Sequence, residues 1–213
     1  MDICVIGLGI FGYEIAIKLT ELGNNVLALD SKPAKINEIK DLVTEAIIGD
    51  ATNPDVLKEL NIKDFDIVIL GMGSKLENLI LCLTYLKKLG AKRIIAKANS
   101  LIQAEILEKI GADEIVLPEK EVAEKLANKL SNPDISELLS LDENLKLMEV
   151  KVPEKFTGKT LRELDLRKKY NITVLMMKKD GKVKLMTNPE LKFEKGDEII
   201  VAGEIDKIQK AFH

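Results

Sequence analysis

Short apolar runs alternate with longer amphipathic segments over the first 131 residues. The runs are rich in β-branched residues and nearly free of polar side chains, which is typical of strands covered on both faces of a parallel sheet. The segments between them have the helical period. The pattern predicts six strands, at 2–7, 25–30, 44–50, 65–71, 92–98 and 113–118, and five intervening helices, at 11–22, 32–42, 54–61, 75–89 and 100–110. This alternation predicts an α/β fold with a doubly wound parallel (Rossmann) sheet.

The pattern changes after a further helix at 119–131. Residues 132–144 show no strong strand and are interpreted as a helical linker. The remainder predicts a strand at 145–153, a short helix at 159–170, a hairpin at 171–186 turning at Asp180–Gly181, a strand at 196–204 and a helix at 204–212. The sequence therefore predicts a Rossmann domain at 1–131, a linker at 132–144 and a smaller α+β domain at 145–213, large enough for dimerisation or ligand sensing.

Three glycines stand between the first predicted strand and the first helix, in the stretch Gly7-Leu8-Gly9-Ile10-Phe11-Gly12. This spacing is typical of a dinucleotide-binding turn. The first glycine permits the tight turn, the second lets a pyrophosphate approach the backbone, and the third lets helix and strand pack closely. The helix N-terminus adds unpaired N–H groups. The alternative is a strand–helix turn that needs glycine for structural reasons only.

An acidic residue, Asp30, ends the second predicted strand and is followed by Ser31 and Lys32. A carboxylate at this place can accept hydrogen bonds from ribose hydroxyls and repels a 2′-phosphate. Asp30 therefore favours NAD and adenosine nucleotides over NADP. Its alternative role is that of a turn residue or a cap for the next helix.

Other candidate ligand-binding residues follow later strands, at the carboxyl ends where ligands bind in open α/β sheets. They are Asp50 and Ala51 after strand three, Met72, Gly73 and Ser74 after strand four, Lys97 at the end of strand five and Glu119 after strand six. Lys97 could face phosphates as a point charge. Each residue taken singly could instead be a cap, a turn residue or a surface charge.

Composition excludes several functions. The net charge of −3 argues against a nucleic-acid partner. No apolar run approaches the roughly 20 residues of a membrane span, and the start of the chain lacks a signal-peptide pattern, so a cytoplasmic location is expected. Cys4 and Cys82 have no metal-ligand spacing and are predicted to be buried thiols, so no metal site is expected. The single histidine, His213, makes histidine-based catalysis within one chain implausible.

The combined motifs resemble the RCK family, the regulators of potassium conductance, and most closely the stand-alone cytosolic subunits of Trk/Ktr potassium uptake systems. The resembling segments are the glycine turn at 7–12, the acid at Asp30, "GDAT" at 49–52, "AKA" at 96–98 and "PE" at 118–119, together with the smaller C-terminal module. The resemblance thus covers nearly the full length.

The resemblance implies a regulatory subunit without enzymatic activity. It implies bound NAD(H), or ATP, ADP or AMP, a homodimer or an octameric ring, and an integral-membrane potassium-translocating partner that holds the protein at the inner face of the cell membrane. Relatives that discriminate ATP often carry Arg where this chain has Ile10, which tilts the expected preference toward NAD(H) or AMP-like ligands. In some relatives the C-terminal module binds a second ligand such as cyclic di-AMP. Arg167 and Asn171 are the candidates here, against the alternative of a merely basic helix end.

Three alternatives stay open from the sequence. An NAD-dependent oxidoreductase would share the first 130 residues, but its only evident acid–base candidate is Lys97. A redox-sensing transcription factor would need a basic winged helix, and no such segment is evident. A structural α/β protein with an empty cleft is the third. We also expect the helix at 119–131 to cross between subunits, and a chain cut near residue 140 to leave a folded nucleotide-binding dimer.

Overall fold

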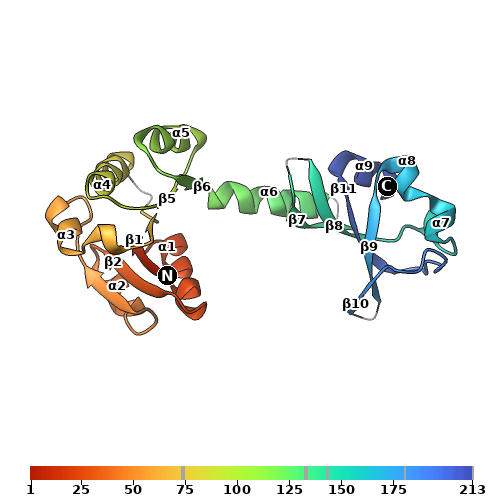
Figure 1. Cartoon of the computed structure of the whole chain (residues 1–213), viewed down its shortest axis with the longest axis horizontal. Coiled ribbons are helices and arrows are strands. Elements are labelled where there is room, and N and C mark those ends of the chain that lie inside the picture. Colours follow the sequence, from red (N-terminus) through yellow and green to blue (C-terminus); the bar gives the residue numbers. More distant parts are fainter. Residues whose placement is uncertain (73–74, 132–133, 143, 180, 213) are drawn as a thin grey trace. The chain divides into compact units, whose positions relative to one another are not determined.

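The structure is a computed structural model that describes residues 1–72, 75–131, 134–142, 144–179 and 181–212. Its contacts divide the chain into two compact units, Met1–Glu121 and Val122–His213. Each unit contains one sheet (Figure 1). Within the described ranges, no helix combines the length and the apolar character that a membrane span requires.

The first unit is built on a parallel sheet with the strand order β3-β2-β1-β4-β5-β6. Every neighbouring pair in this sheet is parallel. The strands are β1 (Asp2–Ile6), β2 (Asn25–Asp30), β3 (Glu45–Ile48), β4 (Ile67–Leu70), β5 (Ile94–Lys97) and β6 (Glu114–Val116). This is the doubly wound order of dinucleotide-binding domains, so the predicted fold class is confirmed.

Helices cover both faces of this sheet because successive strand residues point to opposite sides. On one face, Val5 and Ala28 pack in a core with α1 (Ile10–Glu21) and α2 (Pro33–Ile39). On the other, Cys4 and Leu29 pack in a core with α3 (Pro54–Glu59), α4 (Leu76–Lys88) and α5 (Leu101–Ile110). Cys4 and Cys82 are fully buried free thiols, as predicted, and burial raises the pKa of Cys82 to about 12.

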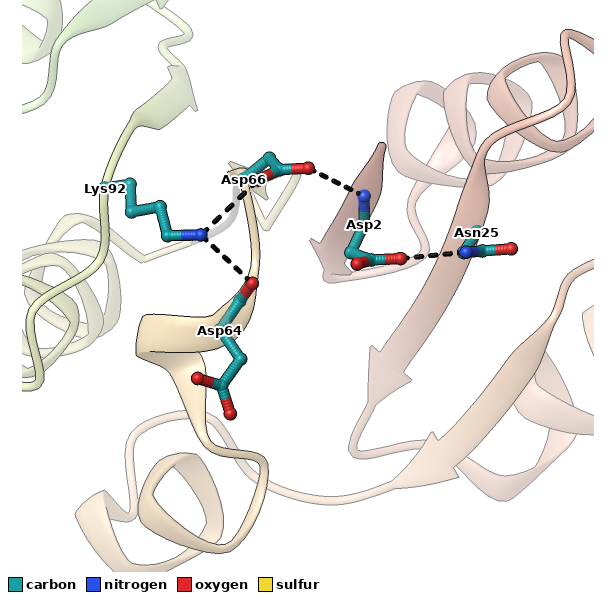
Figure 2. Close-up of polar contacts among 5 residues, drawn as sticks. All are labelled: Asp2, Asn25, Asp64, Asp66 and Lys92. Carbon is teal, nitrogen blue, oxygen red and sulfur yellow. Dashed lines mark hydrogen bonds and ion pairs between the residues drawn. The ribbon is translucent and has the colours of Figure 1, made fainter.

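A small polar network joins the amino ends of the central strands (Figure 2). One carboxylate oxygen of Asp66 accepts the Asp2 N–H at 3.0 Å, and the other accepts from the Lys92 ammonium at 3.4 Å. Lys92 also donates to the main-chain oxygen of Asp64, and Asn25 donates to the Asp2 carboxylate. This network connects β1, β2 and the residues just before β4 and β5, at the edge of the sheet that carries the strand starts.

The second unit contains an antiparallel sheet with the strand order β10-β9-β11-β8-β7. Its strands are β7 (Ile135–Ser140), β8 (Leu145–Lys151), β9 (Thr173–Lys179), β10 (Lys182–Leu185) and β11 (Glu198–Glu204). The helix α9 (Ile205–Phe212) closes its core with Ile208, Ala211 and Phe212, and the ring of Phe212 meets that of Phe156 edge-on. This is the predicted smaller α+β module.

The prediction of a helical linker at 132–144 is wrong. Residues Ile135–Ser140 form β7, which pairs antiparallel with β8. Ile135 is buried in the core of the second unit and pairs with Val150. The segment has few β-branched residues, so its own sequence does not predict a strand. Its secondary structure is set by β8, the partner strand that completes its hydrogen bonds. The division of the chain at 131 and 145 into domains stays a prediction.

Two further differences concern helices. The helix α6 (Pro118–Ser131) begins one residue before its predicted start. The predicted helix at 159–170 is two short helices, α7 (Leu161–Leu164) and α8 (Leu166–Tyr170). Asp165 separates them in the left-handed region with φ +47°, which interrupts the helical hydrogen bonds. In the predicted hairpin turn, Gly181 has φ +73°, while Asp180 lies outside the described residues.

Candidate functional site

A cleft of about 710 Å³ lies at the carboxyl ends of the parallel strands of the first unit. The strand order reverses between β1 and β4, and open α/β sheets bind ligands at such a switch point. Most of the predicted site residues line this cleft. They are Gly7, Gly9, Ile10, Phe11, Asp30, Ser31, Lys32, Asp50, Ala51, Met72, Lys97 and Glu119.

Two predicted residues of the glycine turn do not line the cleft. Leu8 is only 2% exposed and belongs to the core on the α1 and α2 face. Its side chain therefore packs in the core and fixes the turn on the side away from the cleft. Gly12 is buried in α1 against the turn itself. Gly73 and Ser74, two further predicted site residues, lie outside the described residues.

The three glycines of the turn are required for different reasons. Gly7 has φ +90°, and a Cβ there would lie 2.7 Å from the Cβ of Met72. A Cβ on Gly12 would lie 2.0 Å from the main-chain oxygen of Gly7, so the helix can approach the strand only without it. Among the described residues, a Cβ on Gly9 would meet only the Gly71 oxygen, at 3.8 Å. The fold therefore needs glycine at the first and third positions, whereas the second leaves open space on the cleft.

The Asp30 carboxylate is held in place by two main-chain N–H groups. One oxygen accepts from Leu8 N–H at 2.7 Å and the other from Lys32 N–H at 2.9 Å. Asp30 thus joins the end of β2 to the glycine turn after β1. An ionised carboxylate has about four acceptor positions, so two positions remain for ribose hydroxyl groups. The orientation of the acid is fixed before any ligand arrives.

Lys97 and Glu119 form an ion pair at one side of the cleft. The Lys97 ammonium donates to Glu119 Oε1 at 2.6 Å, and the lysine side chain is only 14% exposed while that of Glu119 is 69% exposed. The hydrogen bond from Lys97 holds the pKa of the Glu119 carboxyl below its usual value. Lys97 therefore brings a positive charge to the cleft wall, and Glu119 compensates it at the rim.

The third strand ends in a tight polar turn. Asp50 accepts hydrogen bonds at one carboxylate oxygen from both the main-chain N–H and the hydroxyl of Thr52. Ala51 is 5% exposed and packs in the core beneath. Asp50 therefore has the structural role of a turn residue, and at the same time it lines the cleft.

Seven of the described lining residues are not among the predicted ligand-binding residues. They are Ile6, Leu29, Lys35, Gly49, Gly71, Asn78 and Asn99. Gly49 and Gly71 directly follow β3 and β4 and lie at the ends of the corresponding predicted strands. A Cβ on Gly71 would lie 2.8 Å from the Gly7 oxygen, so the position of a glycine at a strand end could have indicated these two residues. Lys35 and Asn78 lie inside helices, where no motif distinguishes them from surface residues.

The second unit gives weaker evidence for a site. Arg167 and Asn171 are exposed and are not among the residues lining a cavity of about 320 Å³ formed around Leu166, Lys169 and Tyr170. A second ligand there stays a prediction. Among the described residues, no group of three or more His, Cys, Asp or Glu side chains could hold a metal ion.

Comparison with known families decides the family of this chain. Residues 3–118 match the TrkA-N domain, and residues 147–213 match the TrkA-C domain. The chain belongs to the TrkA family. A protein similar to it over both domains is the Ktr system potassium uptake protein C of Bacillus subtilis, which is 35% identical over 98% of this chain and 95% of the relative. The predicted membership of the RCK and Trk/Ktr group is confirmed.

Solved structures agree on the fold. The RCK domain of GsuK aligns over 99% of this TrkA-family chain and 46% of its own, with a TM-score of 0.65 and 16% identity. The GsuK channel solved with NAD aligns with a TM-score of 0.62 at 16% identity, and this chain covers 38% of it. The NAD(P)-binding domain of an exopolyphosphatase-related protein from Archaeoglobus fulgidus is 27% identical over 61% of this chain and 96% of its own, with a TM-score of 0.54.

Proposed function

We propose that this chain is a cytosolic nucleotide-sensing subunit that regulates a membrane potassium uptake system. The observation that carries the proposal is the cleft at the switch point of the sheet. There, Asp30 and the glycine turn are already joined by a hydrogen bond. The similarity to a potassium uptake protein over nearly the whole of both chains supports the regulatory role.

The proposed ligand is an adenine nucleotide. Asp30 would accept hydrogen bonds from the ribose hydroxyls, the N-terminus of α1 at Gly9 would receive the phosphates, and Lys97 would add a positive charge. The GsuK channel bound to NAD supports this choice by likeness of fold, and the NAD(P)-binding domain from Archaeoglobus fulgidus supports it by likeness of fold and sequence. NAD(H), ADP and AMP are the first candidates.

The side chain of Ile10 bears on the preference among nucleotides. It lines the cleft, is 90% exposed and has no hydrogen-bond donor. A γ-phosphate would therefore lack a charge-assisted partner at this place, and we expect ATP to bind no more tightly than ADP. A titration in which ATP binds much more tightly than both ADP and NADH would contradict this preference.

The nucleotide would serve as a signal and not as a reactant. The sequence has no histidine before residue 213 that could transfer a proton in hydride chemistry, and the Lys97 ammonium already donates a hydrogen bond to Glu119. Nucleotide binding would act by favouring one of two states of an assembly, and a coupling of about 1–3 kcal/mol would be enough. The oxidoreductase alternative predicts NADH oxidation with a carbonyl substrate, which a spectrophotometric screen would detect.

The assembly and location are also part of the proposal. The subunit would form a homodimer or an octameric ring and bind an integral-membrane potassium-translocating partner at the inner face of the membrane. The domain at 1–131 would carry the nucleotide, and the domain at 145–213 would contribute dimerisation or sensing. Co-purification with a potassium-translocating membrane protein, with and without nucleotide, would test these assignments.

The first experiment is a thermal-shift and titration series with NAD, NADH, ATP, ADP and AMP on wild type and Asp30→Ala. A nucleotide at 100 times its dissociation constant should stabilise the wild type by about 2.7 kcal/mol. We expect Asp30→Ala to lose most of this shift, because it removes the ribose acceptor and the partner of Leu8 N–H. Failure of every nucleotide to bind the wild type would exclude the proposed function.

A further inference from the structure

The Leu8 peptide groups lie between two side chains of opposite charge. Asp30 accepts the Leu8 N–H, and the Lys35 ammonium donates to the Leu8 main-chain oxygen. Lys35 also lines the cleft. The side chain of Leu8 is buried below, so this residue of the glycine turn is fixed at three points.

The contact made by Lys35 bears directly on the next N–H group. The Leu8 carbonyl and the Gly9 N–H belong to one planar trans peptide, in which the C=O and N–H point in opposite directions. An ammonium that holds the oxygen therefore also sets the direction of the Gly9 N–H. Gly9 is the N-cap of α1 and lines the cleft, and its N–H has no main-chain partner among the described residues.

The position of Lys35 is itself fixed by the fold. Pro33 begins α2, and the neighbouring Ile36 is buried in the core, as is Ile39 one turn further on. The packing of α2 therefore fixes the position of the Lys35 Cα relative to the glycine turn. Lys40, at the end of the same helix, is exposed and is not a lining residue of the cleft, so it offers a matched control for the loss of one positive charge.

We propose that Lys35 is a positioning residue of the nucleotide cleft: its ammonium holds the Leu8 carbonyl so that the Gly9 N–H is oriented to bind a ligand phosphate. This inference rests on the proposed function. It assigns a role in binding to a residue outside the glycine motif and on a different element. Because Asp30 and Lys35 hold opposite ends of Leu8, the turn is organised before the ligand binds, which reduces the cost of ordering it.

The test compares Lys35→Met, Lys35→Arg and Lys40→Met for binding of ADP and of adenosine by calorimetry. Adenosine reaches Asp30 but has no phosphate, so we expect Lys35→Met to weaken ADP binding about tenfold and adenosine binding less than about twofold. Lys35→Arg should recover most of the ADP affinity because the guanidinium can donate to the same oxygen. Lys40→Met should bind both ligands as the wild type does.

A second readout follows the peptide directly. In protein labelled with ¹⁵N-glycine, the Gly9 amide resonance of the ligand-free protein should shift in Lys35→Met and return toward the wild-type position in Lys35→Arg. ADP titrations at low and high salt separate positioning from direct contact, because a direct ammonium–phosphate pair at an open cleft is screened by salt. For a positioning residue, the ratio of wild-type to Lys35→Met affinity should be the same at both salt concentrations.

Three results would overturn the inference. A lower melting temperature in Lys35→Met with an unchanged ratio of ADP to adenosine affinity would make Lys35 a structural residue only. A salt-dependent ratio would make it a direct phosphate ligand. If the wild type binds no nucleotide, the proposed function fails and this inference fails with it. If the wild type binds ADP, and Lys35→Met has the same ratio of ADP to adenosine affinity as the wild type, only this inference fails.

Discussion

Gly9 and Gly12 stand three residues apart, yet a methyl group would meet very different surroundings at the two positions. At Gly12 it would lie 2.0 Å from the Gly7 oxygen, whereas at Gly9 the nearest atom outside the turn is 3.8 Å away. One motif therefore combines a glycine that the fold requires with a glycine that leaves room for a ligand. The sequence pattern does not separate these roles, but the packing around each Cα does.

This difference predicts opposite results for two alanine variants. Gly12→Ala should destabilise the protein by about 3 kcal/mol, because main-chain atoms must move. Gly9→Ala should change the unfolding free energy by no more than about 1 kcal/mol and should weaken ADP binding at least about tenfold, because its methyl group occupies the approach to the phosphates. Denaturant unfolding and calorimetry would measure both. Wild-type affinity in Gly9→Ala would contradict the role given to this glycine.

At the scale of elements, the parallel strands are held at their starts by the network around Asp66 (Figure 2). Asp66 accepts the Asp2 N–H and pairs with Lys92, and these contacts hold the pKa of its carboxyl below the usual value, the Asp2 hydrogen bond contributing most. A lowered pKa in the folded state means that the ionised form stabilises the fold above the unfolded-state pKa and that this contribution is lost as the pH falls.

We therefore expect Asp66→Ala to be less stable than the wild type near neutral pH, with a difference that shrinks as the pH falls from about 5 toward 3. Urea unfolding at a series of pH values would measure it. Asp64→Ala is the control, because only the main-chain oxygen of Asp64 contacts Lys92 and its carboxylate is not part of the network (Figure 2). A difference for Asp66→Ala that is constant with pH would contradict the assignment.

At the scale of the whole molecule, the strand β7 changes where the chain can be divided. A cut near residue 140 would leave Ile135–Ser140 without β8, its only partner in the described sheet. The unpaired N–H and C=O groups of such a strand invite aggregation. A fragment of residues 1–131 keeps the six parallel strands and α6. We expect it to fold, to bind ADP as tightly as the full chain, and to be more soluble than a fragment of residues 1–140. Loss of ADP binding in the shorter fragment would contradict the predicted domain division.

The sequence by itself determined the first unit almost completely. Its strands are short apolar runs, and each becomes a parallel strand within a few residues of the predicted bounds. The strands β1, β2 and β4 are largely buried, and burial on both faces leaves little choice of pattern. The positions of the glycine turn and of Asp30 were also predictable from the sequence, because both follow strands whose carboxyl ends lie at one edge of the sheet. The family follows from these same motifs and from the second module.

Only the tertiary structure decided the remainder, because strand pairing, backbone conformation and helix packing are not recorded in the periodicity of the sequence. Residues 135–140 become a strand because β8 offers a pairing edge, which no local propensity records. Asp165 breaks a continuous helical pattern at a left-handed turn. In the sequence, nothing distinguishes Lys35 from other lysines on helices, and only the packing of α2 brings its ammonium to the Leu8 carbonyl. Periodicity identifies the elements, whereas the contacts between them select the side chains that complete the site.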